Sequence, residues 1–100
     1  METVQVTITV KRAATVAERQ LLGRAVQWMI RLPPRGTRFS IESPQAVERL
    51  LTGAPVPFVF LVADVGPLAE SGGLSAAFNP IGPLVDNIRL NGRSWHGQAG

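Results

Sequence analysis

The amino-acid sequence predicts an α+β fold: a two-layer mixed sheet with the element order β-α-β-α-β, followed by a C-terminal β-hairpin. Three observations lead to this prediction. Thr3–Val10 alternates apolar and polar residues, Thr15–Glu18 has the pattern of a helix-capping box, and Asn91-Gly92 separates two short strand-like runs. A chain of 100 residues can form one core, so we expect residues 1–100 to form a single domain.

The first strand and the first helix follow from side-chain spacing. Alternate residues of Thr3–Val10 would face the core, and the outer face would be Thr3, Gln5, Thr7 and Thr9, an uncharged surface also suited to contact. The helix should run from its Thr15 cap to about Leu32, where Pro33-Pro34 stops it. Gly23 in its interior would let another backbone approach closely. The predicted apolar stripe of this helix is Ala17, Leu21, Ala25, Trp28, Met29 and Leu32.

A second strand and a second helix are expected next. Arg38–Glu42 reads as a short strand with Phe39 and Ile41 inward. Ser43-Pro44 begins a helix that ends at Leu51, and Gly53 suits its C-terminal cap.

The stretch Phe58–Ala63 has no polar side chain and is bounded by proline and glycine, which predicts a strand. Both of its faces are apolar, so we expect both to be covered, as in a strand between two layers.

The remaining chain is predicted as a connection, a hairpin and a tail. Residues 66–83 form an apolar, Gly- and Pro-rich connecting segment, which either folds back over the sheet or meets another subunit. Residues 84–96 form the hairpin, with Leu90 opposite Arg93 and Ile88 opposite Trp95, and residues 97–100 form a tail.

Catalytic chemistry is not indicated. The chain has no cysteine and one histidine, His96, and its carboxylates are scattered. We therefore predict no enzyme activity, and no catalytic, cofactor-binding or metal-binding residues; if the chain were an enzyme, its candidates would be Asp64, Asp86 and His96.

The basic residues suggest an alternative function. The chain carries ten Lys and Arg against seven Asp and Glu, with a net charge of +3. A small nucleic-acid-associated protein would need its arginines on one continuous surface. The candidates for such a patch are Arg31, Arg35, Arg38, Arg89 and Arg93.

The leading prediction is a non-catalytic protein–protein interaction or assembly domain, which self-associates or docks on a larger particle such as a phage or virion component. We expect a protein partner or a homo-oligomer, no membrane partner, and a cytoplasmic or virion location. The candidate interface residues are the apolar ones of the central strand and the connecting segment: Val59, Leu61, Leu68, Leu74, Phe78 and Ile81.

Overall fold

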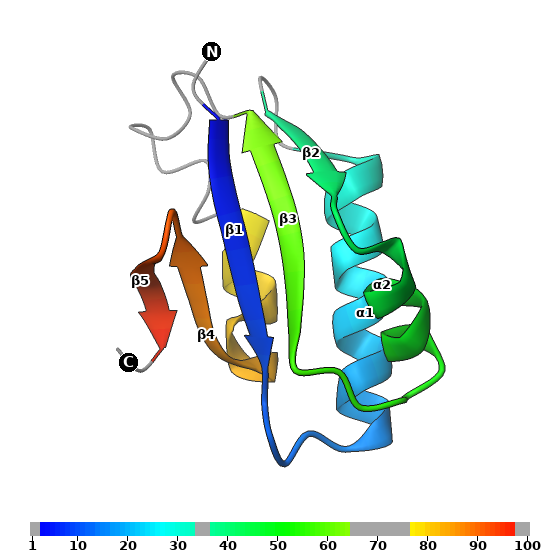
Figure 1. Cartoon of the computed structure of the whole chain (residues 1–100). Helices are drawn as coiled ribbons and strands as arrows, with labels where there is room; N and C mark the ends of the chain where they lie inside the picture. Colours follow the sequence, from blue (N-terminus) through cyan, green and yellow to red (C-terminus); the bar gives the residue numbers. More distant parts are fainter. Residues whose placement is uncertain (1–2, 34–36, 65–76, 98–100) are drawn as a thin grey trace.

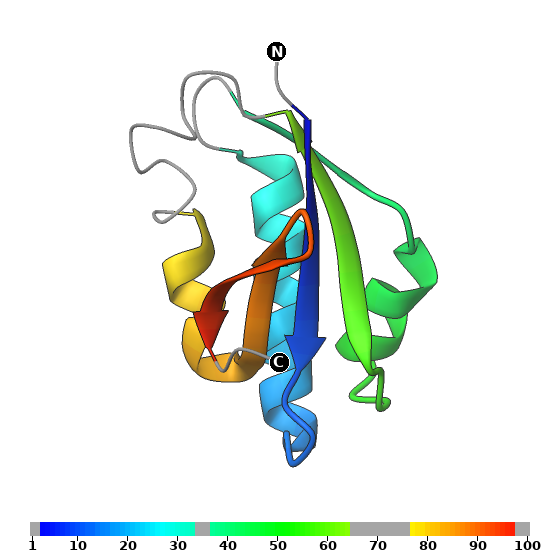
Figure 2. The same cartoon turned by 60° about the vertical axis from the view of Figure 1, so that its left-hand side comes forward.

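The chain forms a five-stranded sheet with helices packed on one side of it (Figures 1 and 2). The computed structural model describes residues 3–33, 37–64 and 77–97. The predicted α+β class and element order are confirmed. The elements are β1 (Thr3–Val10), α1 (Val16–Arg31), β2 (Arg38–Ile41), α2 (Pro44–Leu51), β3 (Phe58–Asp64), the 3-10 helix η2 (Asn79–Leu84), β4 (Val85–Leu90) and β5 (Arg93–Gly97).

The strand order is β2-β3-β1-β4-β5, and every neighbouring pair is antiparallel. In this respect the sheet differs from the mixed sheet that the sequence predicts. Strands β1 and β2 do run in the same direction, as a connecting helix between them requires, but β3 lies between them and pairs with both. Strands β1 and β2 are therefore parallel to each other, although they are not hydrogen-bonded neighbours.

The alternation of β1 sets the two faces of the sheet. Val4, Val6, Ile8 and Val10 are buried under the helices, and the Thr and Gln residues between them point to the opposite face. Across the sheet, Val6 lies opposite Leu61 and Ile8 lies opposite Val59. This register places the apolar rows of β1 and β3 on the same side, where they form the centre of the core.

Helix α1 begins at the predicted capping box, but the face it buries is rotated from the predicted stripe and shares Met29 with it. The Thr15 hydroxyl accepts from the Glu18 amide, and the Glu18 carboxylate accepts from the Thr15 amide, both at 3.1 Å. The buried residues of the helix are Leu22, Gly23, Val26 and Met29. Successive helical residues are turned by about 100°, so Leu22 and Leu21 cannot both face the sheet.

Gly23 explains why α1 settles in this orientation. A Cβ atom on Gly23 would lie 3.1 Å from Leu50 Cβ and 3.1 Å from the Leu51 amide nitrogen of α2. The glycine therefore allows the close backbone approach that the sequence predicts, and α2 takes that side of the helix. Because α2 lies beside Gly23, the residues of α1 that face the sheet are Leu22, Val26 and Met29.

The central strand β3 is covered on one face only by the described residues, which corrects the expectation of two covered faces. Val59, Leu61 and Ala63 are buried under the helices. Phe58 is 43% exposed, and Phe60 and Val62 are half-buried on the other side. Figure 1 shows this side of the sheet facing the viewer, with α1 and η2 behind it.

Residues 77–83, the described part of the connecting segment, fold back over the helix side of the sheet. Phe78 and Ile81 are fully buried there. The Phe78 ring packs edge-on between Phe39 and Trp95, with centroid distances of 6.0 and 5.6 Å. Of the two predicted alternatives, these residues therefore take the first and fold back over their own sheet. Residues 66–76 lie outside the described part.

The C-terminal hairpin is confirmed, with a small shift in its register. Asn91 and Gly92 both have positive φ, 51° and 80°, as the turn requires. Leu90 pairs with Arg93 as predicted, but an irregularity next to Arg89 pairs Ile88 with His96 instead of Trp95. Strand β5 includes Gly97, and the rest of the predicted tail lies outside the described residues.

Candidate functional site

The predicted interface residues that the structure describes are buried. Val59, Leu61, Phe78 and Ile81 are at most 1% exposed and belong to the core. Leu68 and Leu74 lie outside the described residues. These four residues belong to the core because the helix layer covers the inner face of the sheet.

An exposed apolar stripe on α1 takes their place as the candidate protein contact. The α1 stripe consists of Leu21, Ala25, Trp28 and Leu32, which lie on one face of the helix. Leu21 is 50% exposed, Trp28 is 62% exposed and Leu32 is 66% exposed. Exposed contiguous apolar surface of this kind marks interaction sites on proteins, and Trp is among the residues that contribute most to binding energy at interfaces.

A groove runs beside the α1 stripe, between α1 and η2. Its volume is about 440 Å³, and no charged side chain lines it. The residues that line it are Ala25, Trp28, Met29, Leu32, Ala77, Pro80 and Ile81. The stripe and the groove therefore form one apolar surface on the helix side of the molecule.

The open face of the sheet is a second candidate surface. It carries Phe58, Phe60 and Val62 of β3 beside the Thr and Gln residues of β1, in the register Phe58–Thr9, Phe60–Thr7 and Val62–Gln5. The two phenyl rings pack edge to face with their centroids 4.6 Å apart. None of the described helices covers these residues (Figures 1 and 2).

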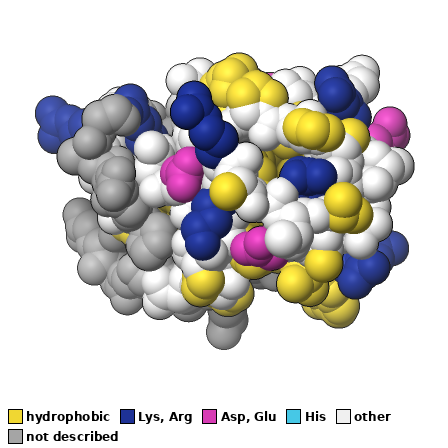
Figure 3. Space-filling model, turned by 90° about the horizontal axis from the view of Figure 1, so that it is seen from below, with side chains coloured by type: hydrophobic (Ala, Val, Ile, Leu, Met, Phe, Trp, Pro, Cys, Tyr) yellow, Lys and Arg dark blue, Asp and Glu magenta, His cyan; other side chains and the backbone are white. Residues whose placement is uncertain are grey.

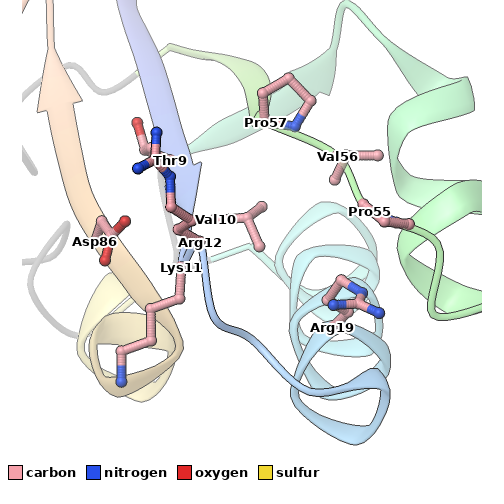
Figure 4. A pocket seen from close by; sticks show the side chains of 9 residues that line it. All are labelled: Thr9, Val10, Lys11, Arg12, Arg19, Pro55, Val56, Pro57 and Asp86. Carbon is pink, nitrogen blue, oxygen red and sulfur yellow. The ribbon is translucent and has the colours of Figure 1, made fainter.

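A basic cleft of about 490 Å³ lies at the pole where β1 ends and β3 begins. Figure 3 views the molecule from this pole and shows Lys and Arg side chains interspersed with apolar ones. The cleft is lined by Thr9, Val10, Lys11, Arg12, Arg19, Pro55, Val56, Pro57 and Asp86. Figure 4 shows the Arg12 side chain turned back toward Thr9 at the end of the sheet, while Lys11 points away from it.

Arg19 is the fixed cation of the basic cleft. Its Nε donates to the Gly53 carbonyl at 2.6 Å, and its Nη1 donates to the Ala14 carbonyl. These bonds hold the guanidinium between the start of α1 and the loop before β3. Lys11 and Arg12 are exposed, so their positive charges are available at the mouth of the cleft.

The arginines predicted for a nucleic-acid patch are not gathered on one surface. Arg38 of β2 and Arg89 of β4 point to the open face by their register with Asp64 and Thr7. Arg31 is exposed at the end of α1 in the helix layer, and Arg93 follows the hairpin turn. Arg35 lies outside the described residues. Two of the five therefore share the face that carries Phe58 and Phe60.

The three residues considered for catalysis are also separated. Asp64, at the end of β3, accepts a 2.8 Å hydrogen bond from the Thr3 hydroxyl. Asp86 lines the basic cleft at the other pole, and His96 belongs to the edge strand β5. Within residues 3–33, 37–64 and 77–97 no group of three His, Cys, Asp or Glu residues could hold a metal ion.

The pKa of Glu18 lies below its ordinary value. The Thr15 backbone amide and then the Thr15 hydroxyl hydrogen-bond to the ionised carboxylate, and both lower the pKa of Glu18. The positive charge of Lys11 lowers this pKa further. The group has a capping role at the start of α1, next to the basic cleft.

The sequence predicts the residues of the α1 stripe as core-facing, whereas Leu21, Trp28 and Leu32 are exposed. The available signal was the width of the apolar surface: apolar residues occupy positions 21, 22, 25, 26, 28, 29 and 32, which is more than one face of a helix can bury against a single layer. The basic cleft had no such signal, because it combines four separate parts of the chain.

Among the described residues, no helix has the length and apolarity needed to cross a membrane. Comparison of the chain with known protein families, curated proteins and solved structures finds no match.

Proposed function

We propose that this protein is a non-catalytic assembly domain that associates with a second copy of itself through the α1 stripe. The observation that supports this proposal is the exposure of Leu21, Trp28 and Leu32 along one side of a helix, beside an apolar groove. On a chain of this size, leaving a tryptophan and two leucines in water is unfavourable unless another surface covers them.

The spacing of the α1 stripe suits a twofold contact. In an antiparallel pair of α1 helices, Leu21 of one copy would face Leu32 of the other, and Ala25 would face Trp28. Positions 21 and 32 lie at equal distances from the centre of the stripe, and so do positions 25 and 28. A small side chain then meets a large one, which favours interdigitation, and the same patch serves both copies, as a twofold interface requires.

The wider form of the proposal is docking on a larger particle, such as a phage or virion component, through the same stripe. In that case the α1 stripe would meet an apolar segment of a different protein. The two forms differ in partner and share Trp28 as the central contact, so one set of variants tests both.

The test is size-exclusion chromatography with light scattering over a concentration series. The wild-type chain should shift from monomer to dimer, Trp28→Glu should stay monomeric, and Gln27→Glu, an exposed neighbour outside the stripe, should behave as the wild type. A wild-type chain that stays monomeric throughout contradicts self-association. Docking through this stripe is also contradicted if the wild-type chain and Trp28→Glu capture the same partners, or if neither captures any.

A further inference from the structure

We infer that the open face of the sheet, together with the basic cleft at its lower end, binds single-stranded nucleic acid. Bases would stack on Phe58 and Phe60, and phosphates would contact Lys11 and Arg12. This surface lies on the side of the sheet opposite the α1 stripe, so the inference does not depend on the proposed function.

The aromatic pair supplies the stacking surface. Phe58 and Phe60 are two residues apart on one strand, so both point to the open face, and Phe58 is 43% exposed. Proteins that bind single strands without sequence preference stack successive bases on aromatic side chains presented in this way. A flat sheet reaches unstacked bases more readily than the bases inside a duplex.

The basic cleft supplies the phosphate contacts. Phe58 pairs with Thr9, and Thr9 lines the cleft, so the aromatic surface is continuous with the cationic one. Arg12 is turned back toward Thr9 (Figure 4), the residue that pairs with Phe58. Three cations, Lys11, Arg12 and Arg19, line the cleft against one carboxylate, Asp86, which gives the site a net positive charge.

The polar part of the open face fits the same ligand. Thr7, Thr9 and Gln5 lie beside the aromatic residues and can donate or accept hydrogen bonds without carrying charge. Asp64, the carboxylate on this face, lies at the far end of β3 from Phe58 and is hydrogen-bonded by Thr3. A second copy of the chain is a poorer occupant, because its own cations would face those of the first copy.

The experiment measures the fluorescence anisotropy of a labelled oligothymidylate, about 12 nucleotides long, at several salt concentrations. The wild-type chain should bind it at low salt and bind the matched duplex more weakly. Phe58→Leu keeps an apolar side chain but removes the aromatic face, so affinity should fall about tenfold with the salt dependence unchanged.

A variant without Lys11 and Arg12 distinguishes the phosphate contacts of the basic cleft from the stacking on Phe58 and Phe60. Replacing Lys11 and Arg12 together by Ser should reduce the slope of log K against log salt by about 1.4, because each lost phosphate contact contributes about 0.7 for a single strand. Trp28→Glu, on the opposite layer, should bind the oligonucleotide as the wild type does, which distinguishes this site from the self-association surface.

Several outcomes would overturn the inference. The first is no binding at low salt, and the second is equal binding of duplex and single strand. A third is unchanged affinity in both Phe58→Leu and Phe60→Leu, each shown to be folded by circular dichroism, which would leave only non-specific charge attraction. A concentration-dependent dimer that is lost in Phe58→Leu, without oligonucleotide binding, would assign the open face to a protein contact instead.

Discussion

Leu21 and Leu22 are adjacent residues with opposite surroundings. Leu22 is fully buried between α1 and the sheet, whereas Leu21 is 50% exposed on the α1 stripe. Their side chains are chemically identical, so the difference in their energetic roles comes from packing alone.

The variants Leu22→Ala and Leu21→Ala should therefore differ sharply. Leu22→Ala should lower the free energy of unfolding by about 2–5 kcal/mol, because it leaves a cavity in the core. Leu21→Ala should change it by no more than about 0.5 kcal/mol and should weaken self-association. Urea unfolding of both variants checks the first effect. Equal losses of stability would contradict the orientation of α1.

Glu18 makes the start of α1 sensitive to acid. Its pKa lies below the ordinary value of 4.5 because the Thr15 amide and hydroxyl stabilise the ionised carboxylate. A group with a lowered folded-state pKa stabilises the fold above its unfolded-state pKa, and this contribution is lost as the pH falls through the folded-state pKa.

The expected result is a pH-dependent gap between the wild type and Glu18→Gln, which keeps a side-chain oxygen but cannot ionise. The wild-type chain should lose stability relative to the variant as the pH falls below 4.5. Urea midpoints across this range measure the gap, and NMR titration of the Glu18 carboxyl gives its pKa directly. A gap that does not change with pH would show that the capping carboxylate is not stabilised.

At the scale of the element, α1 is positioned by what it packs against. Gly23 lies where α1 and α2 approach most closely, and the atoms that an added Cβ would meet are Leu50 Cβ, the Leu51 amide nitrogen and Leu51 Cδ2, each at 3.1 Å. Two of these three atoms belong to the backbone or to the base of a buried side chain, so they cannot move aside without shifting α2.

Gly23→Ala should accordingly destabilise the protein. Alanine gains about 1 kcal/mol of helix propensity over glycine, but overpacking of a tight contact costs about 1–3 kcal/mol. We expect a net loss of about 1 kcal/mol in the free energy of unfolding, measured with urea. Arg24→Ala, an exposed substitution in the same turn, is the control. A stabilised Gly23→Ala variant would mean that the two helices separate at little cost.

At the scale of the whole molecule, two unlike surfaces lie on opposite layers. The α1 stripe is apolar and has Arg24 and Arg31 along one edge, both exposed. In the twofold pair, these arginines of the two copies would approach each other. The open face and the basic cleft combine aromatic rings with cations.

Salt should therefore act on the two surfaces in opposite directions. Added salt screens the repulsion between the arginine edges, so self-association should strengthen. Oligonucleotide binding should weaken, because releasing counterions into a more concentrated salt solution is less favourable. Light scattering and anisotropy on the same protein, across one salt series, make the comparison. Parallel responses of both measurements would contradict the assignment of two separate surfaces.

Most of the elements and their order are predictable from the residues alone. Local signals have local causes: the alternation of Thr3–Val10 fixes the faces of β1, the Thr15–Glu18 box starts α1, and Asn91-Gly92 supplies the two positive φ angles of the turn. Each of these patterns acts through neighbours in the chain, so it is readable before folding.

Which apolar faces are buried depends on packing between distant parts of the chain. Helix α1 has two adjacent apolar arcs, and the contact of Gly23 with α2 selects Leu22, Val26 and Met29 for the core while Trp28 stays outside. Likewise β3 has two apolar faces, and the helix layer covers Val59 and Leu61 and leaves Phe58 open. These choices depend on residues far apart in the sequence, because burial is a property of the packed layers and not of the strand or helix that carries the side chains.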